Sequence, residues 1–112
     1  MLPRIHRFSP RTEAPDFFQI ARVISSRLFA LHYLISENKQ WKATIIVSKK
    51  VSGLAVRRNT LKRMVRTQLL EYFSQKNPKL MLAVVIKPAI LNRDSTSVKR
   101  ELNSLLSQLT QS

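Results

Sequence analysis

The chain has 112 residues, of which 20 are lysine or arginine and 6 are aspartate or glutamate, so its formal net charge is +14 at pH 7. This length suits one domain over residues 1–112, and the lack of cysteine excludes disulfide bonds and thiolate metal sites. Because so large a positive charge destabilises a folded chain unless a polyanion neutralises it, we expect a nucleic acid as the partner.

The first part of the chain is predicted to form an arm, a helix and two strands. Prolines within residues 1–15 predict an irregular basic arm. Asp16 is a candidate N-cap for a short helix that ends near Ile24. Aromatic and branched residues predict strands over residues 27–35 and 41–48, and the short polar connection between them favours a hairpin.

The second part is predicted to add a strand between two helices. Gly53, the single glycine, suits a sharp loop with a third short strand at its edge. Apolar periodicity predicts a helix over residues 59–75, and a continuous apolar run predicts a buried strand over residues 79–87. Ser95 or Thr96 can cap a last helix. The order α-β-β-β-α-β-α predicts an α+β fold, a two-layer sandwich in which helices pack on a mixed four-stranded sheet.

The central predicted helix has a cationic flank that no acidic residue offsets. On a helical wheel its basic residues occupy one arc beside the apolar stripe. Like charges spaced three or four residues apart destabilise a helix by about 0.2 to 0.5 kcal/mol per pair, and solvated faces usually alternate in sign. We therefore interpret the flank as an array of phosphate contacts. The residues predicted to bind RNA are Lys49, Lys50, Arg57, Arg58, Asn59, Lys62, Arg63 and Arg66.

Aromatic residues near the predicted first helix and first strand can form a platform for unpaired bases, which stack on aromatic rings inside basic grooves. The candidates are Phe17, Phe18, Phe29, His32 and Tyr33. Most aromatic side chains in so small a domain belong to its core. Because adjacent strand residues point to opposite faces, we favour His32 on the binding face and Tyr33 in the core. Trp41 fits either role.

The stretch VSKKVSGLAVRRNTLKRMVR, residues 47–66, resembles the signature of the bacterial ribonuclease P protein subunit family. The family pattern is a Ser-Lys-Lys turn, a Gly-x-Ala-Val step and an Arg-Asn-x-x-Lys-Arg-x-x-Arg helix. The matching positions are Ser48, Lys49, Lys50, Gly53, Ala55, Val56, Arg58, Asn59, Lys62, Arg63 and Arg66. The chain departs from the pattern at Thr60, where the family often has arginine, and at Ala21, where it often has an aromatic residue.

The resemblance implies a subunit of ribonuclease P, the endonuclease that removes the 5′ leader from precursor tRNA. In that family a large RNA carries out the hydrolysis with Mg²⁺, and one protein is expected per RNA. The family fold includes a left-handed βαβ crossover, and a cleft between the sheet and the first helix holds the leader. The residues that the resemblance places in this cleft are Phe17, Phe29, His32 and Ser48.

No catalytic site of the protein's own is visible in the sequence, since the acidic residues are scattered and the two histidines, His6 and His32, are far apart. A structural RNA-binding protein, such as a ribosomal component, remains the alternative. A helical DNA reader is less favoured, because the basic helix must also serve as a core helix beside strands. The longest apolar run, residues 80–86, is too short to span a bilayer, so we expect a cytoplasmic protein without membrane contact.

Overall fold

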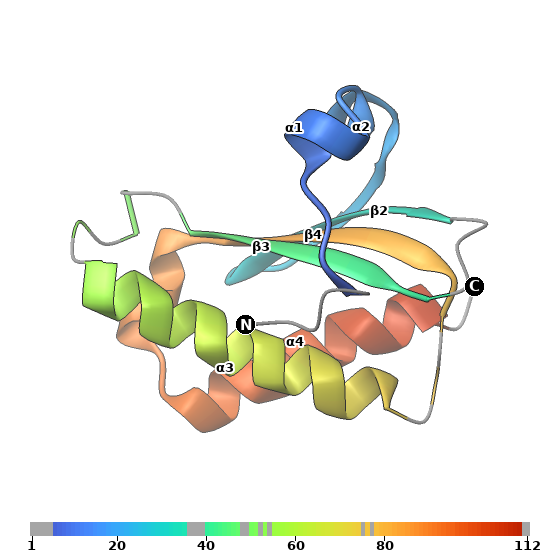
Figure 1. Ribbon diagram of the computed structural model, residues 1–112. Helices are drawn as coiled ribbons and strands as arrows, with labels where there is room; N and C mark the ends of the chain where they lie inside the picture. Colours follow the sequence, from blue (N-terminus) through green and yellow to red (C-terminus); the bar gives the residue numbers. More distant parts are fainter. Residues whose placement is uncertain are drawn as a thin grey trace.

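The computed structural model describes residues 6–35, 40–47, 50–51, 53, 55–74, 76 and 78–110. In chain order its elements are α1 (Pro10–Glu13), α2 (Phe17–Ile20), β1 (Arg22–Ser25), β2 (Phe29–Ile35), β3 (Lys42–Val47), α3 (Ala55–Phe73), β4 (Leu80–Ile86), the 3-10 helix η2 (Pro88–Asn92) and α4 (Ser95–Thr110) (Figure 1). The predicted α+β class and the predicted order of helices and strands are confirmed.

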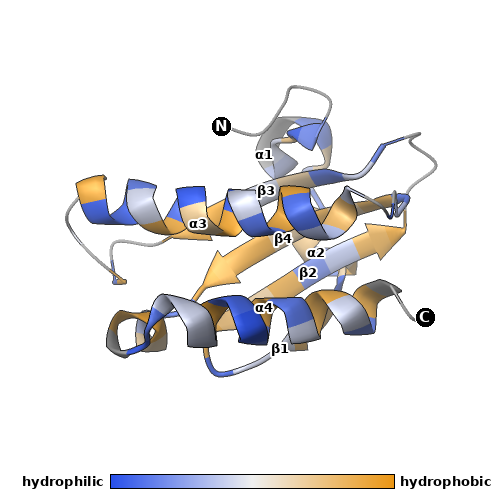
Figure 2. Ribbon diagram, turned by 90° about the horizontal axis from the view of Figure 1, so that it is seen from below, coloured by the Kyte–Doolittle hydropathy of each residue, from blue (hydrophilic) through white to orange (hydrophobic). Residues whose placement is uncertain are grey.

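The four strands form one mixed sheet in the order β1-β2-β4-β3. β1 and β4 are both antiparallel to β2, whereas β3 is parallel to β4. The continuous apolar sequence of β4 is explained by its place inside the sheet, with a strand on each side and helices below. From β3 the chain passes beneath the sheet along α3 and returns in β4 behind β3 (Figures 1 and 2). This crossover is left-handed, as the resemblance implied, although about 98% of such connections are right-handed.

The main core lies between the sheet and the pair α3 and α4, which cover its lower face (Figure 1). Figure 2 shows the two helices side by side across the strands, and apolar residues of both helices belong to this core. Val65 and Leu69 of α3, Leu102 of α4 and Leu31 of β2 are fully buried there. Gln68 is also buried, and its Nε2 donates to Asn103 Oδ1 at 2.5 Å, which ties α3 to α4. None of the helices in the described ranges is long and apolar enough to cross a membrane.

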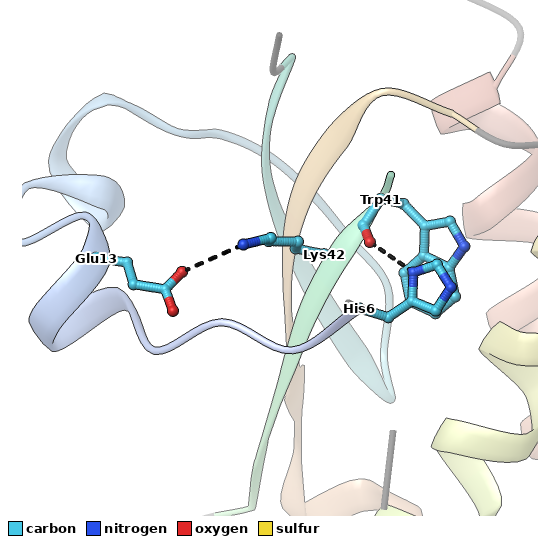
Figure 3. Close-up of polar contacts among 4 residues, drawn as sticks. All are labelled: His6, Glu13, Trp41 and Lys42. Atoms are coloured by element: carbon cyan, nitrogen blue, oxygen red, sulfur yellow. Dashed lines mark hydrogen bonds and ion pairs between the residues drawn. The ribbon is translucent and has the colours of Figure 1, made fainter. Parts of the chain in front are cut away.

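The N-terminal segment follows the outer edge of β3 and is held there by specific contacts (Figure 3). Arg7 forms a parallel β-bridge with Ala43. His6 Nδ1 donates a hydrogen bond of 2.8 Å to the carbonyl oxygen of Trp41. Glu13 and Lys42 form an ion pair at 3.9 Å. The prediction of an irregular arm is therefore wrong for the described part of the arm, which includes the short helix α1.

The predicted first helix is too long. It ends at Ile20, and Ile24 belongs instead to strand β1, where it pairs with Leu31 on the core face of the sheet. Sheet pairing outweighs the helical spacing of a few apolar residues, since propensity is a weak prior. Asp16 precedes α2 but makes no capping hydrogen bond with its side chain. The third strand is thus β1, and the described residues around Gly53 (50–51, 53 and 55) do not form the strand predicted there.

Three further predictions, on strand pairing and on helix ends, are corrected. Residues 27–35 and 41–48 do not pair as a hairpin, because β4 lies between β2 and β3. α3 begins at Ala55, before the predicted start at residue 59. α4 begins at Ser95, so Asp94 precedes it as the cap, and the hydrogen bond from Ser97 lowers the pKa of the Asp94 carboxyl.

The turn between β1 and β2 is fastened to α4 and to the end of β4. The Glu101 carboxylate of α4 accepts hydrogen bonds from the Ser26 hydroxyl at 2.5 Å and from the Leu28 backbone N–H at 2.8 Å. Lys87 Nζ donates to the Ser26 carbonyl oxygen at 2.7 Å. Glu101 therefore ties the turn between β1 and β2 to α4, and Lys87 ties it to the end of β4.

Candidate nucleic-acid interface

One flank of α3 is cationic and uncompensated, as predicted. Arg58, Lys62 and Arg66 follow one another at intervals of four residues and are half-buried, whereas Arg57 and Arg63 are exposed. Within the described ranges none of these five side chains has an ion pair with a carboxylate. The like charges are therefore close neighbours along one helix face, and the fold itself offers them no counter-charge.

Three of the six carboxylates of the chain make contacts away from the flank. Glu13 pairs with Lys42, Glu101 accepts from Ser26 and Leu28, and Asp94 precedes α4. The cationic flank is thus left for an external anion.

A cleft of about 330 Å³ opens where α3 meets the outer edge of β3 and the N-terminal segment. We call it the edge cleft; its lining residues are Arg7, Phe8, Ala43, Thr44, Ile45, Lys62 and Arg66. The Nε of Arg66 is buried and has no hydrogen-bond partner. A buried donor without an acceptor is destabilising, and a phosphate oxygen would satisfy it with a charge-assisted bond. The edge cleft is therefore a candidate phosphate site.

The face of the sheet turned away from α3 and α4 is only partly covered. α1 and α2 lie on it, where Phe17 packs against Phe8 and Ala83 (Figure 1). Beside α2, the ring of Phe18 meets His32 edge to face at 5.1 Å between centroids. Phe18 is 45% exposed, and Val23, opposite His32 in the β1–β2 pair, is 51% exposed. We call this surface, made by Phe18, Val23 and His32, the open face.

The structure separates the predicted cleft residues. His32 lies on the open face and Tyr33 packs against the main core, so both orientations are as expected. Phe29 is fully buried under the sheet among the core residues, so its prediction as a contact residue is wrong. Phe17 is also fully buried, and it supports Phe8 and Phe18 instead of forming a surface. The depth of burial decides whether Phe17 and Phe29 can contact a ligand, and the positions of aromatic residues in the sequence do not show that depth.

The predicted RNA-binding residues are dispersed over one side of the helix. Lys62 and Arg66 meet in the edge cleft, while Lys50, Arg57 and Asn59 are exposed near the start of α3 or before it. Ser48 and Lys49 lie outside the described residues. Sequence reasoning missed Arg7, which reaches the same cleft only because its segment pairs with β3. It named Phe18 among the candidates for the aromatic platform but left it out of the leader cleft, although Phe18 is the aromatic residue that the open face exposes.

Trp41 is buried in the core. Its ring stacks on His6 at 3.9 Å between centroids and lies 5.0 Å from the ring of Phe73. Trp41 thus belongs to the core and not to the face predicted to bind the leader, and it lies at the end of the sheet where the N-terminal arm arrives (Figure 3).

Burial lowers the pKa of His32, whose Nδ1 is buried without a hydrogen-bond partner. The usual pKa of histidine is about 6.5. As the pH falls below this value, His32 binds a proton in the unfolded chain but remains neutral in the folded chain, so acid should destabilise the fold. We expect thermal stability to fall from about pH 7 to about pH 5, and less steeply in His32→Gln. Melting curves of both proteins across this range test the prediction, since groups other than His32 contribute equally to both. Equal pH dependence in the two proteins would contradict it.

Comparisons with known proteins agree on one family. The family model described as Ribonuclease P matches residues 2–110. The ribonuclease P protein component of Synechococcus elongatus is 30% identical over an alignment that covers 96% of this chain and 92% of that protein.

Solved structures share the fold. The ribonuclease P protein from Thermotoga maritima aligns with a TM-score of 0.81 and 21% identity over 92% of this chain and 96% of that one. The Staphylococcus aureus ribonuclease P protein aligns with a TM-score of 0.82 and 19% identity, over 93% and 94% of the two chains. At such low identity these two structures establish the fold alone.

Proposed function

This chain belongs to the ribonuclease P protein family, and from that premise we propose that it is the protein subunit of ribonuclease P, which removes the 5′ leader from precursor tRNA. One copy joins one catalytic RNA in the cytoplasm. The RNA holds the Mg²⁺ and performs the hydrolysis, while the protein contributes binding.

The observation that carries the proposal is the uncompensated flank of α3 beside the edge cleft. Arg58, Lys62 and Arg66 are held at fixed spacing by the helix, and the Arg66 Nε is buried without an acceptor. An RNA backbone supplies phosphates in a row, and such contacts supply most of the affinity of a nucleic-acid complex. Lys50, Arg57 and Arg63 extend the cationic surface beyond the cleft.

We assign the 5′ leader to the open face. Unpaired nucleotides bind by stacking on aromatic rings, and Phe18 presents an exposed ring beside His32. Because Phe18 and His32 lie on the face of the sheet opposite α3, the protein can contact its RNA partner and the leader at the same time. The carboxylates at Glu13, Glu101 and Asp94 already have structural partners, which supports leaving the hydrolysis to the RNA.

Reconstitution tests this function. The purified chain is mixed with bacterial ribonuclease P RNA and a precursor tRNA at an Mg²⁺ concentration where the RNA alone is slow. Stimulated cleavage at the mature 5′ end supports the proposal. Binding to the RNA without stimulation would instead favour a structural RNA-binding protein, such as a ribosomal component.

Phe18→Ala is expected to weaken the binding of precursor tRNA to the reconstituted enzyme by about 5- to 100-fold, since stacking contributes about 1 to 3 kcal/mol per base. Binding of mature tRNA, which lacks the leader, should not change. Ile20→Ala is the matched control, because Ile20 is 60% exposed on the same helix and points away from Phe18. Equal losses for the precursor and the mature tRNA would remove Phe18 from the leader site.

A further inference from the structure

A second pocket lies next to the edge cleft. Residues of α3 and of the N-terminal segment line both, and we call the two together the groove. The second pocket has a volume of about 380 Å³, in the range of small-ligand sites. We call it the Trp41 pocket; its lining residues are His6, Gln40, Trp41, Leu70, Phe73 and Ser74.

The walls of this pocket are aromatic and held in place. The rings of His6 and Trp41 are nearly parallel, with 10° between their planes, and the hydrogen bond from His6 Nδ1 to the Trp41 carbonyl oxygen fixes the pair (Figure 3). Phe73 packs against the Trp41 ring, and Leu70 remains 36% exposed at the rim. His6, Gln40 and Ser74 add polar atoms to the lining beside these apolar side chains. A flat ring with polar edges suits such a site.

The Trp41 pocket adjoins the edge cleft, which carries the cationic side chains. On α3, Leu70 of the pocket follows Arg66 of the edge cleft by four residues, about 6 Å along the helix axis. On the arm, His6 lines the pocket and its neighbour Arg7 lines the cleft. A site for phosphate and a site for an aromatic ring are thus adjacent on the same two segments.

We propose that this groove binds one unpaired nucleotide of the RNA partner, with its phosphate at Lys62 and Arg66 and its base in the Trp41 pocket. The proposal rests on the proposed function for the identity of the polyanion. Charge complementarity selects the phosphate, and the aromatic pocket selects a base that is free of pairing. A base inside an A-form duplex is stacked and cannot enter. The site is separate from the open face, which lies across the sheet.

Trp41 is the single tryptophan of the chain, so its fluorescence reports on this pocket. The test titrates the full chain with a six-nucleotide single-stranded RNA and with a duplex of the same sequence. The chain carries Phe18→Ala, which removes the exposed ring of the open face. We expect a saturable fluorescence change with the single strand and binding about 10-fold weaker with the duplex. Equal responses to both RNAs would overturn the proposal.

Variants locate the base and the phosphate. Ser74→Tyr, which fills the pocket from the exposed end of α3, should weaken single-strand binding by about 10-fold. Thr67→Tyr adds the same side chain at an exposed position outside the pocket and should change binding less than about 2-fold. Leu70→Ala, which shortens the rim, serves as a second pocket variant if Ser74→Tyr folds poorly. Arg66→Gln should make the slope of log affinity against log salt shallower by about 0.7 to 0.9, the contribution of one phosphate contact.

The two proposals fail in different ways. If both pocket variants bind the single strand as tightly as their parent, the nucleotide site is wrong, even where reconstituted cleavage is normal. If the unmodified chain does not stimulate cleavage, the proposed function is wrong, and the fluorescence titration still decides whether the pocket accepts an unpaired nucleotide.

Discussion

Replacing Arg58, Lys62 and Arg66 together by glutamine is expected to weaken binding to ribonuclease P RNA by about 100- to 1,000-fold. Each substitution removes one charge-assisted contact, for which we take about 1 to 1.4 kcal/mol, slightly below the usual range for bonds to charged groups. The slope of log affinity against log salt should become shallower by about 2 to 3, since each lost phosphate contact contributes about 0.7 to 0.9.

The same variant should fold at least as well as the parent. Arg58 with Lys62, and Lys62 with Arg66, are like-charged pairs at four-residue spacing, and each costs about 0.2 to 0.5 kcal/mol. Glutamine keeps a long side chain and a good helix propensity, so the half-buried stems lose little packing. Binding and stability should therefore change in opposite directions, which is expected of residues retained for a ligand.

Filter binding at several salt concentrations and circular dichroism melting measure the two effects. The matched control replaces Lys79, Arg93 and Lys99, exposed residues outside α3, by glutamine and makes the same change in net charge. If the control loses as much affinity as the α3 variant, overall charge explains binding and the flank has no special role. A cooperative loss of the fold in the α3 variant would show that these cations are structural.

Glu101→Ala should give the largest loss of stability among the single substitutions considered. It removes the acceptor of both the Ser26 hydroxyl and the Leu28 backbone N–H. Leu28 is itself buried, and the other acceptor of its N–H, the Ser26 hydroxyl, lies at 3.4 Å, so the donor is left with a long hydrogen bond only; a poorly satisfied buried donor costs about 1 to 3 kcal/mol. We expect a total loss of about 2 to 3 kcal/mol and a melting temperature lower by about 10 °C.

Urea unfolding measures this loss directly. Glu71→Ala is the control, because it also removes one negative charge but from an exposed position on α3. Its effect should stay within about 0.5 kcal/mol, as for other surface substitutions. A small effect of Glu101→Ala would mean that sheet pairing and the Lys87 hydrogen bond suffice to hold the turn between β1 and β2.

Much of the fold was accessible from patterns with strong local causes. The apolar run of β4 and the leucine spacing of α4 each depend on one element and its burial, and both were predicted within a few residues. The predictions were wrong where the structure of a segment depends on pairing with residues far away in the sequence. Ile24 has helical spacing with Phe17, but it pairs with Leu31 in the sheet. β3 pairs with β4 instead of β2, because β4, which follows α3 in the chain, lies between the two strands.

The amino-acid sequence by itself determined that the chain is a basic α+β domain with an uncompensated cationic helix flank, because charge and apolar spacing are local properties of residues 55–73. Only the tertiary structure decided that Arg7 joins Lys62 and Arg66, that His6 and Trp41 form a pocket beside them, and that Phe18 is exposed while Phe17 and Phe29 are buried. The physical reason is that these relations depend on which segments meet across the sheet edge and how deeply each ring is covered. Both follow from long-range packing, which no short window of sequence contains.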